Sequence, residues 1–264
     1  MTIRQLQLAP RMQRRSTLAL PGWGRLFAKD WLVTVSVVLV YFLLRGQADG
    51  DQGFAMQVSR VLIDIERATY TFWEPAVQEA SIRYHWVQEV ANFVYAYLHF
   101  PVLIAVGLWM WVKRRSEFLF MRGVMFISMV FGLAFYFFLP AAPPRLLEMH
   151  GYDLGFVDTV FGGNTNVSYA QPSFILNEYA AIPSFHFGWI ALASAVVWVN
   201  TRNPWLRAFA VFLSAIMSWA IVASANHFFI DMALGGLIVG ISWAIARWLQ
   251  RRDAAREASV PAAA

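Results

Sequence analysis

The sequence contains no cysteine and little charge. Because none of its 264 residues is Cys, disulfides and thiolate chemistry are excluded. Asp, Glu, Lys and Arg make up 14% of the residues, whereas about 25% is usual for a soluble domain. Lysine is scarce too, since Lys29 and Lys113 are the only two in the chain. The low charged fraction argues against a soluble globular protein.

Apolar residues are abundant and occur in long runs. They make up 59% of the chain, and the mean hydropathy is +0.49. Runs of roughly 20 apolar residues are long enough to cross a bilayer. Twelve Trp and 22 Phe suit the aromatic belts of a membrane protein. We therefore predict an all-α, polytopic membrane helical bundle with about six transmembrane helices. The predicted spans cover residues 31–44, 86–112, 118–139, 185–199, 205–225 and 228–249.

The basic residues are distributed unevenly between the two sides of these spans. If the N-terminus is cytoplasmic, 16 of the 21 Lys and Arg residues are cytoplasmic, and five lie on the other side. Those five are Arg45, Arg60, Arg67, Arg83 and Arg145. Because cytoplasmic loops are enriched in Lys and Arg, we predict a multi-pass protein of the cell membrane with both termini in the cytoplasm.

This topology defines the expected domain organisation. We predict a basic cytoplasmic N-terminus (residues 1–30), a single membrane domain with the catalytic site (31–249) and a cytoplasmic tail (250–264). Two long loops, residues 46–85 and 140–182, then lie outside. The first loop carries Phe54, Val58, Val61, Leu62 and Ile65 at helical spacing, which predicts an amphipathic helix on the outer membrane surface.

The expected partners are membrane lipids. A pI near 9.7 could suggest nucleic-acid binding, but the basic residues are spread over short loops, so no nucleic-acid partner is expected. The oligomeric state does not follow from the sequence.

Four ionisable residues stand at the outer ends of the spans. Arg145 follows the third span, His186 opens the fourth, and His227 and Asp231 lie between the fifth and the sixth. Ionisable groups inside membrane spans are costly and are usually functional. Since the topology places all four at one depth on one side, we predict that they form one site.

The residue types at this site favour phosphate chemistry. His227 and Asp231 are separated by four residues, so the carboxylate can bind one imidazole nitrogen and increase the basicity of the other. Such a histidine can act as a nucleophile or a base. Pro183 and Ser184 predict a helix start, whose free N–H groups favour an anion beside His186. Arg145 adds a planar guanidinium that suits phosphate.

Three short motifs carry a resemblance to a known family. "PSFH" at residues 183–186 and "HFFID" at 227–231 resemble the Pro-Ser-x-His and His-x-x-x-Asp motifs of the type 2 phosphatidic acid phosphatase superfamily, which follow a motif with Lys and Arg. The resemblance covers roughly residues 90–245. "PAAPPRLL", "NEYAAIPSFHFGW" and "NHFFID" look most similar to the branch that includes inositol phosphorylceramide synthases.

The resemblance implies a role for each matching residue. His227 would be the nucleophile and carry a phosphohistidine, and Asp231 would orient it. His186 would protonate the leaving alcohol and then activate the acceptor. The phosphate would be held by Arg145 and by the amides near Ser184 and Phe185. The family needs no metal or other cofactor. The implied activity is that of a phosphatase or phosphotransferase acting on lipid phosphates at the extracytoplasmic face.

The sequence departs from the family pattern at three positions. The lysine of the first motif is missing, so we expect arginine to hold the phosphate alone. The arginine that usually precedes the third motif is replaced by Ile221, and Phe185 stands where glycine is common. These departures favour the inositol-phosphotransferase branch over the simple phosphatases.

Other interpretations of the same residues stay open. A lipid-phosphate transporter or flippase could use the polar cluster to bind a headgroup. His186, His227 and Asp231 could instead bind zinc, or could be interfacial and capping groups in a structural scaffold. His99, which shares a helix face with Tyr95, is either a hydrogen-bonded core histidine or a residue of a substrate pocket together with Tyr95 and Asn226.

Overall fold

The computed structural model describes residues 21–48, 50–162, 165–167, 172 and 174–259, which are mostly helical. Across these ranges there is no β-strand, and the predicted all-α class is confirmed. A five-residue π-helix, η1, joins α4 to α5. The elements are α1 (Pro21–Gln47), α2 (Gln52–Ala68), α3 (Glu74–Ile82), α4 (His85–Phe93), η1 (Val94–Leu98), α5 (His99–Lys113), α6 (Arg115–Phe138), α7 (Pro144–Met149), α8 (Phe185–Asn200), α9 (Pro204–Ala223) and α10 (Phe229–Ser259).

The chain divides into two compact units, residues 1–38 and 39–264. In the first unit, the described residues 21–38 are the N-terminal part of α1. This helix extends beyond the predicted span at both ends, and Gly22–Gln47 is long and apolar enough to cross a membrane. The second unit contains the remaining helices and the whole candidate site.

The second unit contains helices at the positions of the other five predicted spans, and four of them qualify as membrane spans. His85–Lys113, Arg115–Phe138, Pro204–Ala223 and Phe229–Arg256 are each long and apolar enough to cross a membrane, and α8 is a shorter apolar helix of 16 residues. α8 starts at Phe185, directly after the predicted Pro-Ser start signal. The protein is therefore a polytopic membrane helical bundle, as the hydropathy pattern predicts.

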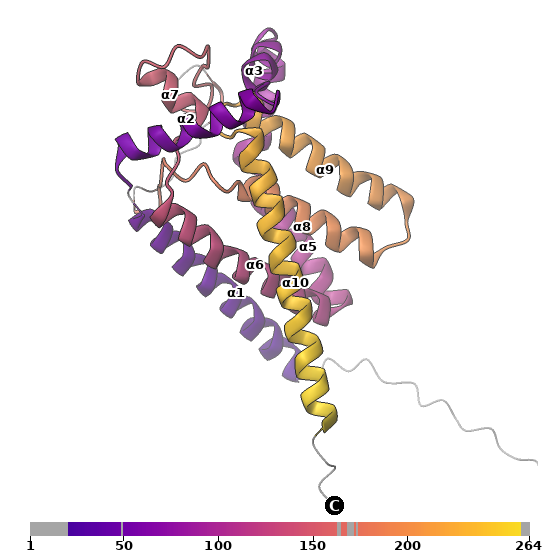
Figure 1. Cartoon of the computed structure of the whole chain (residues 1–264). Coiled ribbons are helices and arrows are strands. Elements are labelled where there is room, and N and C mark those ends of the chain that lie inside the picture. The colour runs from indigo at the N-terminus through magenta and orange to yellow at the C-terminus, as the bar shows by residue number, and fades with distance from the viewer. Residues whose placement is uncertain (1–20, 49, 163–164, 168–171, 173, 260–264) are drawn as a thin grey trace, which may run out of the picture. The chain divides into compact units, whose positions relative to one another are not determined.

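Close helix contacts bring the starts of α8 and α10 together. α8 packs along α9, and α10 packs against both α6 and α8 (Figure 1). A Cβ on Gly235 would overlap the carbonyl oxygen of Ser184, and one on Gly188 would lie 2.9 Å from the Gly235 oxygen. Only glycine permits this approach. The backbone N–H of Ser184 then donates to the Asp231 carbonyl at 3.0 Å, which joins the first turns of the two helices.

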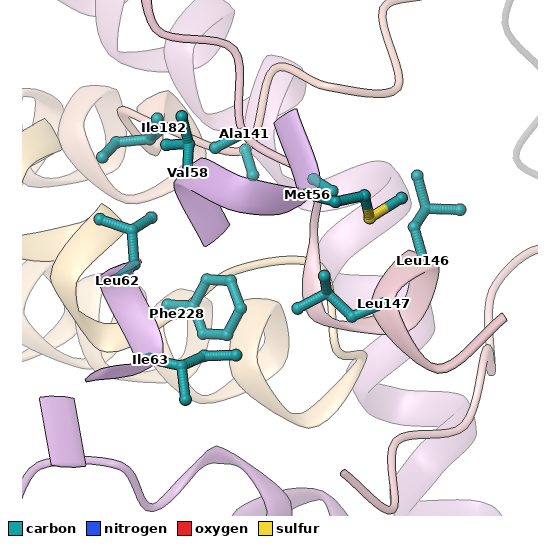
Figure 2. Packing of buried hydrophobic residues seen from close by; sticks show 11 residues of the cluster. Met56, Val58, Leu62, Ile63, Ala141, Leu146, Leu147, Ile182 and Phe228 are labelled. Atoms are coloured by element: carbon teal, nitrogen blue, oxygen red, sulfur yellow. The ribbon is translucent and has the colours of Figure 1, made fainter. Parts of the chain in front are cut away.

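The short helices α2 and α7 cover this end of the bundle with an apolar cluster. Phe228 is fully buried at its centre, and its ring lies among Leu62, Ile63 and Leu147 (Figure 2). The cluster also includes Ala141, from a segment that forms an isolated parallel bridge with Ala180. The segments just before α8 and α10 are thus fixed in position by apolar contacts with α2 and α7, in addition to the contacts between the long helices.

The predicted apolar face of α2 is divided between two environments. Val58 and Leu62 are buried in the cluster, whereas Phe54, Val61 and Ile65 are 43%, 56% and 43% exposed. The expected surface amphipathic helix is therefore present as α2, and it packs against the protein through a stripe that includes only part of the predicted apolar face. That stripe contains Ala55, Met56, Ser59, Leu62, Ile63 and Glu66.

Candidate active site

A cavity of about 100 Å³ lies where the starts of α8 and α10 meet η1, α7 and the C-terminal end of α1. Its polar lining includes three histidines and two arginines, and its apolar lining is largely aromatic. The polar side chains are Arg45, Tyr95, His99, Tyr136, Arg145, Asn177, Glu178, His186, Asn226 and His227. A cationic and aromatic lining of this kind suits an anionic group carried by an apolar molecule.

His227 is held through one nitrogen of its ring. Nδ1 lies 2.9 Å from the carbonyl oxygen of Ala181 and 3.4 Å from Oδ2 of Asp231, which is fully buried. Both neighbours are hydrogen-bond acceptors, so Nδ1 carries the proton and donates it to them. The lone pair is then on Nε2. This is the tautomer that a nucleophilic histidine requires.

His186 lies across the cavity from His227. The centroids of the two rings are 5.6 Å apart, and both side chains line the same cavity. His186 belongs to the first turn of α8, while His227 lies two residues before the start of α10. The contact between these two helix starts therefore sets the spacing of the two imidazoles.

Arg145 lies in α7 and is held in a fixed position at the cavity. Its Nε donates to Oδ1 of Asn226 at 3.1 Å, and Nη1 donates to Oδ2 of Asp158 at 3.2 Å. The guanidinium carbon is 4.2 Å from the centre of the Phe161 ring, and the side chain is buried. Asp158 balances part of its charge, so Arg145 is a preorganised but partly neutralised cation.

Of the two residues predicted to hold phosphate at the start of α8, Phe185 lines the cavity and Ser184 does not. Phe185 lines the cavity and stacks on Trp189, with ring centroids 4.9 Å apart and planes 6° from parallel. Ser184 is fully buried, and its hydroxyl is not among the groups that line the cavity. Any phosphate contact from this turn would therefore come from backbone N–H groups.

Tyr95, His99 and Asn226 all line the cavity. The rings of Tyr95 and His99 lie 4.7 Å and 5.0 Å from that of His186. Nδ1 of His99 is buried and has no hydrogen-bond partner among the described residues. His99 is thus a cavity residue rather than a histidine fully satisfied within the core.

Arg45 also lines the cavity, although the sequence analysis expected arginine at one position only. Its Nη1 and Nη2 donate to the carbonyl oxygens of Ile175 and Asn177 at 3.4 Å, and its guanidinium lies over the rings of Phe42 and Tyr136. A charged residue at the outer end of the first span was the available signal, but Arg45 was counted only among the five basic residues on the outer side.

Two buried glutamates near the start of α10 were missed as well. Glu66 and Glu74 are 1% and 0% exposed, and each accepts a backbone N–H from the first turn of α10. Glu66 lies on the buried stripe of α2, three residues after Ile63, and the apolar pattern of the sequence did not identify that stripe. Across the described ranges, no group of three or more His, Asp or Glu side chains is placed to hold a metal ion.

The fold and cavity define a multi-pass helical membrane protein with a site lined by histidine and arginine. The chain belongs to the PAP2 superfamily, whose match covers residues 60–245. It is similar to the phosphoinositol dihydroceramide synthase of Bacteroides thetaiotaomicron, with 27% identity over 208 residues. That similarity covers 71% of this chain and 65% of the relative, which is slightly less than two thirds of the relative's length. No solved structure matches the chain.

Proposed function

We propose that the protein is a membrane phosphotransferase that acts on a phosphate ester of a lipid through a phosphohistidine at His227. The observation that carries the proposal is the arrangement of His227. Two acceptors fix its Nδ1–H, which leaves Nε2 as the nucleophile. The ring centroids of His186 and His227 are 5.6 Å apart, and both residues line a cavity that Arg145 also lines. Membership of the superfamily and the name of the synthase relative support the same class of reaction.

In the first step, Nε2 of His227 attacks the phosphorus of the donor lipid. A P–N bond forms and the P–O bond to the lipid alcohol breaks. His186, as imidazolium, donates its proton to the departing oxygen. Asp231 and the Ala181 carbonyl stabilise the positive charge that develops on His227, because both accept from Nδ1–H.

In the second step, the acceptor hydroxyl replaces the lipid alcohol. His186 is now neutral and removes the acceptor's proton as its oxygen attacks phosphorus. The P–N bond breaks, and His227 regains its lone pair. Arg45 and Arg145 hold the non-bridging oxygens in both steps, since guanidinium groups match phosphate oxygens in geometry and charge.

The phosphoryl group transferred is proposed to carry inositol. The named relative makes a phosphoinositol lipid, and the departures from the family pattern favour the same branch. Phosphatidylinositol would then be the donor and the hydroxyl of a ceramide-like lipid the acceptor. We further propose that the site opens to the extracytoplasmic leaflet, because His186, His227 and Arg145 lie at the ends of the spans opposite the Arg-rich loops.

The phosphohistidine is tested by trapping. Purified protein in detergent is mixed with donor labelled at phosphorus and quenched under alkaline conditions, in which phosphohistidine survives. We expect label on the wild-type protein and none on His227→Ala. His186→Ala should gain label when the leaving group is a nitrophenol, which needs no proton, and should hold it longer because the second step lacks its base. His85→Ala, at a 68% exposed side chain, should behave as wild type.

The outcomes separate the candidate functions. A folded wild-type protein that binds the donor but never takes up label would contradict the proposal and favour a lipid carrier. If labelled protein forms, adding ceramide-like alcohols should release a labelled lipid. Release of inositol phosphate alone, at a rate that no alcohol changes, would identify a hydrolase instead of a transferase.

A further inference from the structure

The proposed mechanism leaves two buried acidic side chains without a role. Glu66 lies in the last turn of α2 and Glu74 begins α3, and their exposed fractions are 1% and 0%. Carboxyl groups are almost never buried to this extent without specific partners. Their partners are in α10, more than 150 residues further along the chain.

Three carboxyl groups bind three successive N–H groups at the start of α10. Oε1 of Glu74 accepts from Phe229 N at 2.8 Å, and Oε1 of Glu66 accepts from Ile230 N at 2.7 Å. Oδ2 of Asp231 accepts from Phe228 N at 2.9 Å. The first N–H groups of a helix have no partner within the helix, and its dipole favours negative charge there. The three groups together satisfy this end of α10.

The two glutamates also bind each other. Their carboxyl groups interact with each other, and their Oε2 atoms are buried with no hydrogen-bond partner in the described part of the chain. Two carboxyl groups can form a hydrogen bond with each other only if one of them holds a proton. A pair joined in this way therefore shares a proton.

The surroundings strengthen the hold on that proton. Burial, followed by the hydrogen bond and the charge repulsion from Glu74, raises the pKa of Glu66 to about 9. Burial likewise raises the pKa of Glu74. Asp231, from α10, is the other charged group that acts on the pair, and it raises both values.

This turn of α10 connects the pair to both histidines. Asp231, in the same turn, accepts from Nδ1 of His227 through its side chain. Its backbone carbonyl accepts from Ser184 N, two residues before His186. A displacement of the first turn of α10 would therefore change the hydrogen bond to the nucleophile and the spacing of the two imidazoles.

We propose that Glu66 and Glu74 are positioning residues for the phosphotransfer reaction, acting as a proton-sharing pair that fixes the first turn of α10 and thereby aims His227 at phosphorus. The inference rests on the proposed function. Neither glutamate is among the residues that line the cavity, so each acts through the backbone that it binds.

The pair is tested by comparing Gln and Ala replacements. In Glu66→Gln, the amide oxygen can still accept from Ile230 N, and the amide nitrogen can replace the shared proton by donating to Glu74. We expect kcat within about threefold of wild type at pH 7. Glu66→Ala and Glu74→Ala should lower kcat about 100-fold, the loss associated with a displacement of roughly 1 Å, with little change in KM. The matched control is Gln78→Ala, because Gln78 is equally buried in α3 but binds the backbone of Val157.

The shared proton predicts a pH dependence of stability and kcat that a purely structural role of the two glutamates would not produce. Its pKa is about 9 in the folded protein against 4.5 without the fold, so its contribution to stability is complete below pH 4.5 and is lost as the pH rises to about 9. Wild-type protein should therefore lose thermal stability between pH 4.5 and about 9, and lose kcat as the pH passes about 9. Glu66→Gln has no such proton and should lose less of both.

Hydrogen exchange of the peptide covering residues 224–235 reports on the turn without any turnover. We expect faster exchange in Glu66→Ala and Glu74→Ala than in Gln78→Ala. The proposal is overturned if kcat and exchange in these variants match Gln78→Ala, or if the pH profiles of wild type and Glu66→Gln coincide. A wild-type protein that forms no phosphohistidine would instead refute the proposed function, while exchange and thermal unfolding still report on the pair.

Discussion

Arg45 and Arg145 line the same cavity but are held by different kinds of partner. Arg145 forms an ion pair with Asp158 at 3.2 Å, which offsets part of its charge. Arg45 contacts two carbonyl oxygens and two aromatic rings, and it forms no ion pair among the described residues. A cation without a carboxylate partner attracts a bound anion more strongly. We therefore expect the substrate phosphate to depend on Arg45 although this residue lies outside the matched range 60–245.

Replacing Arg45 should weaken the reaction more than replacing an arginine outside the cavity. A hydrogen bond to a charged group contributes about 1.5–3 kcal/mol, so Arg45→Ala should lower kcat/KM about 10- to 100-fold. Arg45→Lys should recover only part of this loss, because an ammonium lacks the planar fork. Arg60→Ala is the control, since its guanidinium lies over the Tyr152 ring. Equal kcat/KM for Arg45→Ala and Arg60→Ala would show that Arg45 does not hold the phosphate.

The sequence could indicate some of these residues but not others. His186, His227 and Arg145 could be grouped because each stands where a span ends on the same side, which is a property of the topology. Arg45 also stands at the outer end of a span. Its position in the sequence does not show whether its side chain points into the cavity or away from it. Glu66 acts on α10 only because α2 folds across its start, and that docking depends on side-chain packing.

At the scale of helices, the cavity wall depends on a close contact between α6 and α8. The ring of Phe185 lies so close to Gly132 that a Cβ there would overlap it, and the same ring stacks on Trp189. The ring is thus packed against both residues. Glycine at position 132 leaves the space in which Phe185 forms part of the cavity wall.

A methyl group at position 132 should therefore disturb both packing and the site. Gly132→Ala is expected to destabilise the protein by roughly 1–3 kcal/mol, as overpacking does, and to lower kcat. Gly123→Ala is the matched control in the same helix, because nothing lies within 4 Å of its added Cβ. That control should be neutral or stabilising, since alanine favours helix by about 0.5–1 kcal/mol. Thermal unfolding in detergent and kcat provide the comparison, and equal behaviour of the two variants would contradict the packing argument.

The sequence predicted where helices begin and end better than it predicted which face of a helix is buried. α8 begins at Phe185 as its Pro-Ser signal predicts, because local backbone chemistry sets a helix start. The buried stripe of α2 did not follow from its apolar pattern. Either of two apolar stripes on that helix could be buried. Which one is buried depends on contacts with Ala142 and Phe228, which come from distant segments.

For the whole molecule, long apolar runs and loop charges predicted the bundle and the convergence of the site. A chain that crosses the membrane several times must return its loops to the same two surfaces, so residues 40 or more positions apart meet at one end. This constraint is absent in soluble proteins, and it explains why four polar residues from two outer connections could be assigned to one site. It does not set distances within the cavity, which depend on contacts such as that between Ser184 and Asp231.

The orientation of the molecule can be tested with single thiols, because the chain contains no cysteine. Asp64→Cys places an exposed thiol on α2, and Arg202→Cys places one in the exposed turn between α8 and α9. With 16 basic residues on the side of the N-terminus and five on the other, we expect a membrane-impermeant maleimide to label Asp64→Cys in intact cells. Arg202→Cys should react only after the membrane is opened, as seen by a mass shift on a gel. The reverse pattern would place the cavity on the cytoplasmic side, where its donor and acceptor lipids would have to come from the inner leaflet.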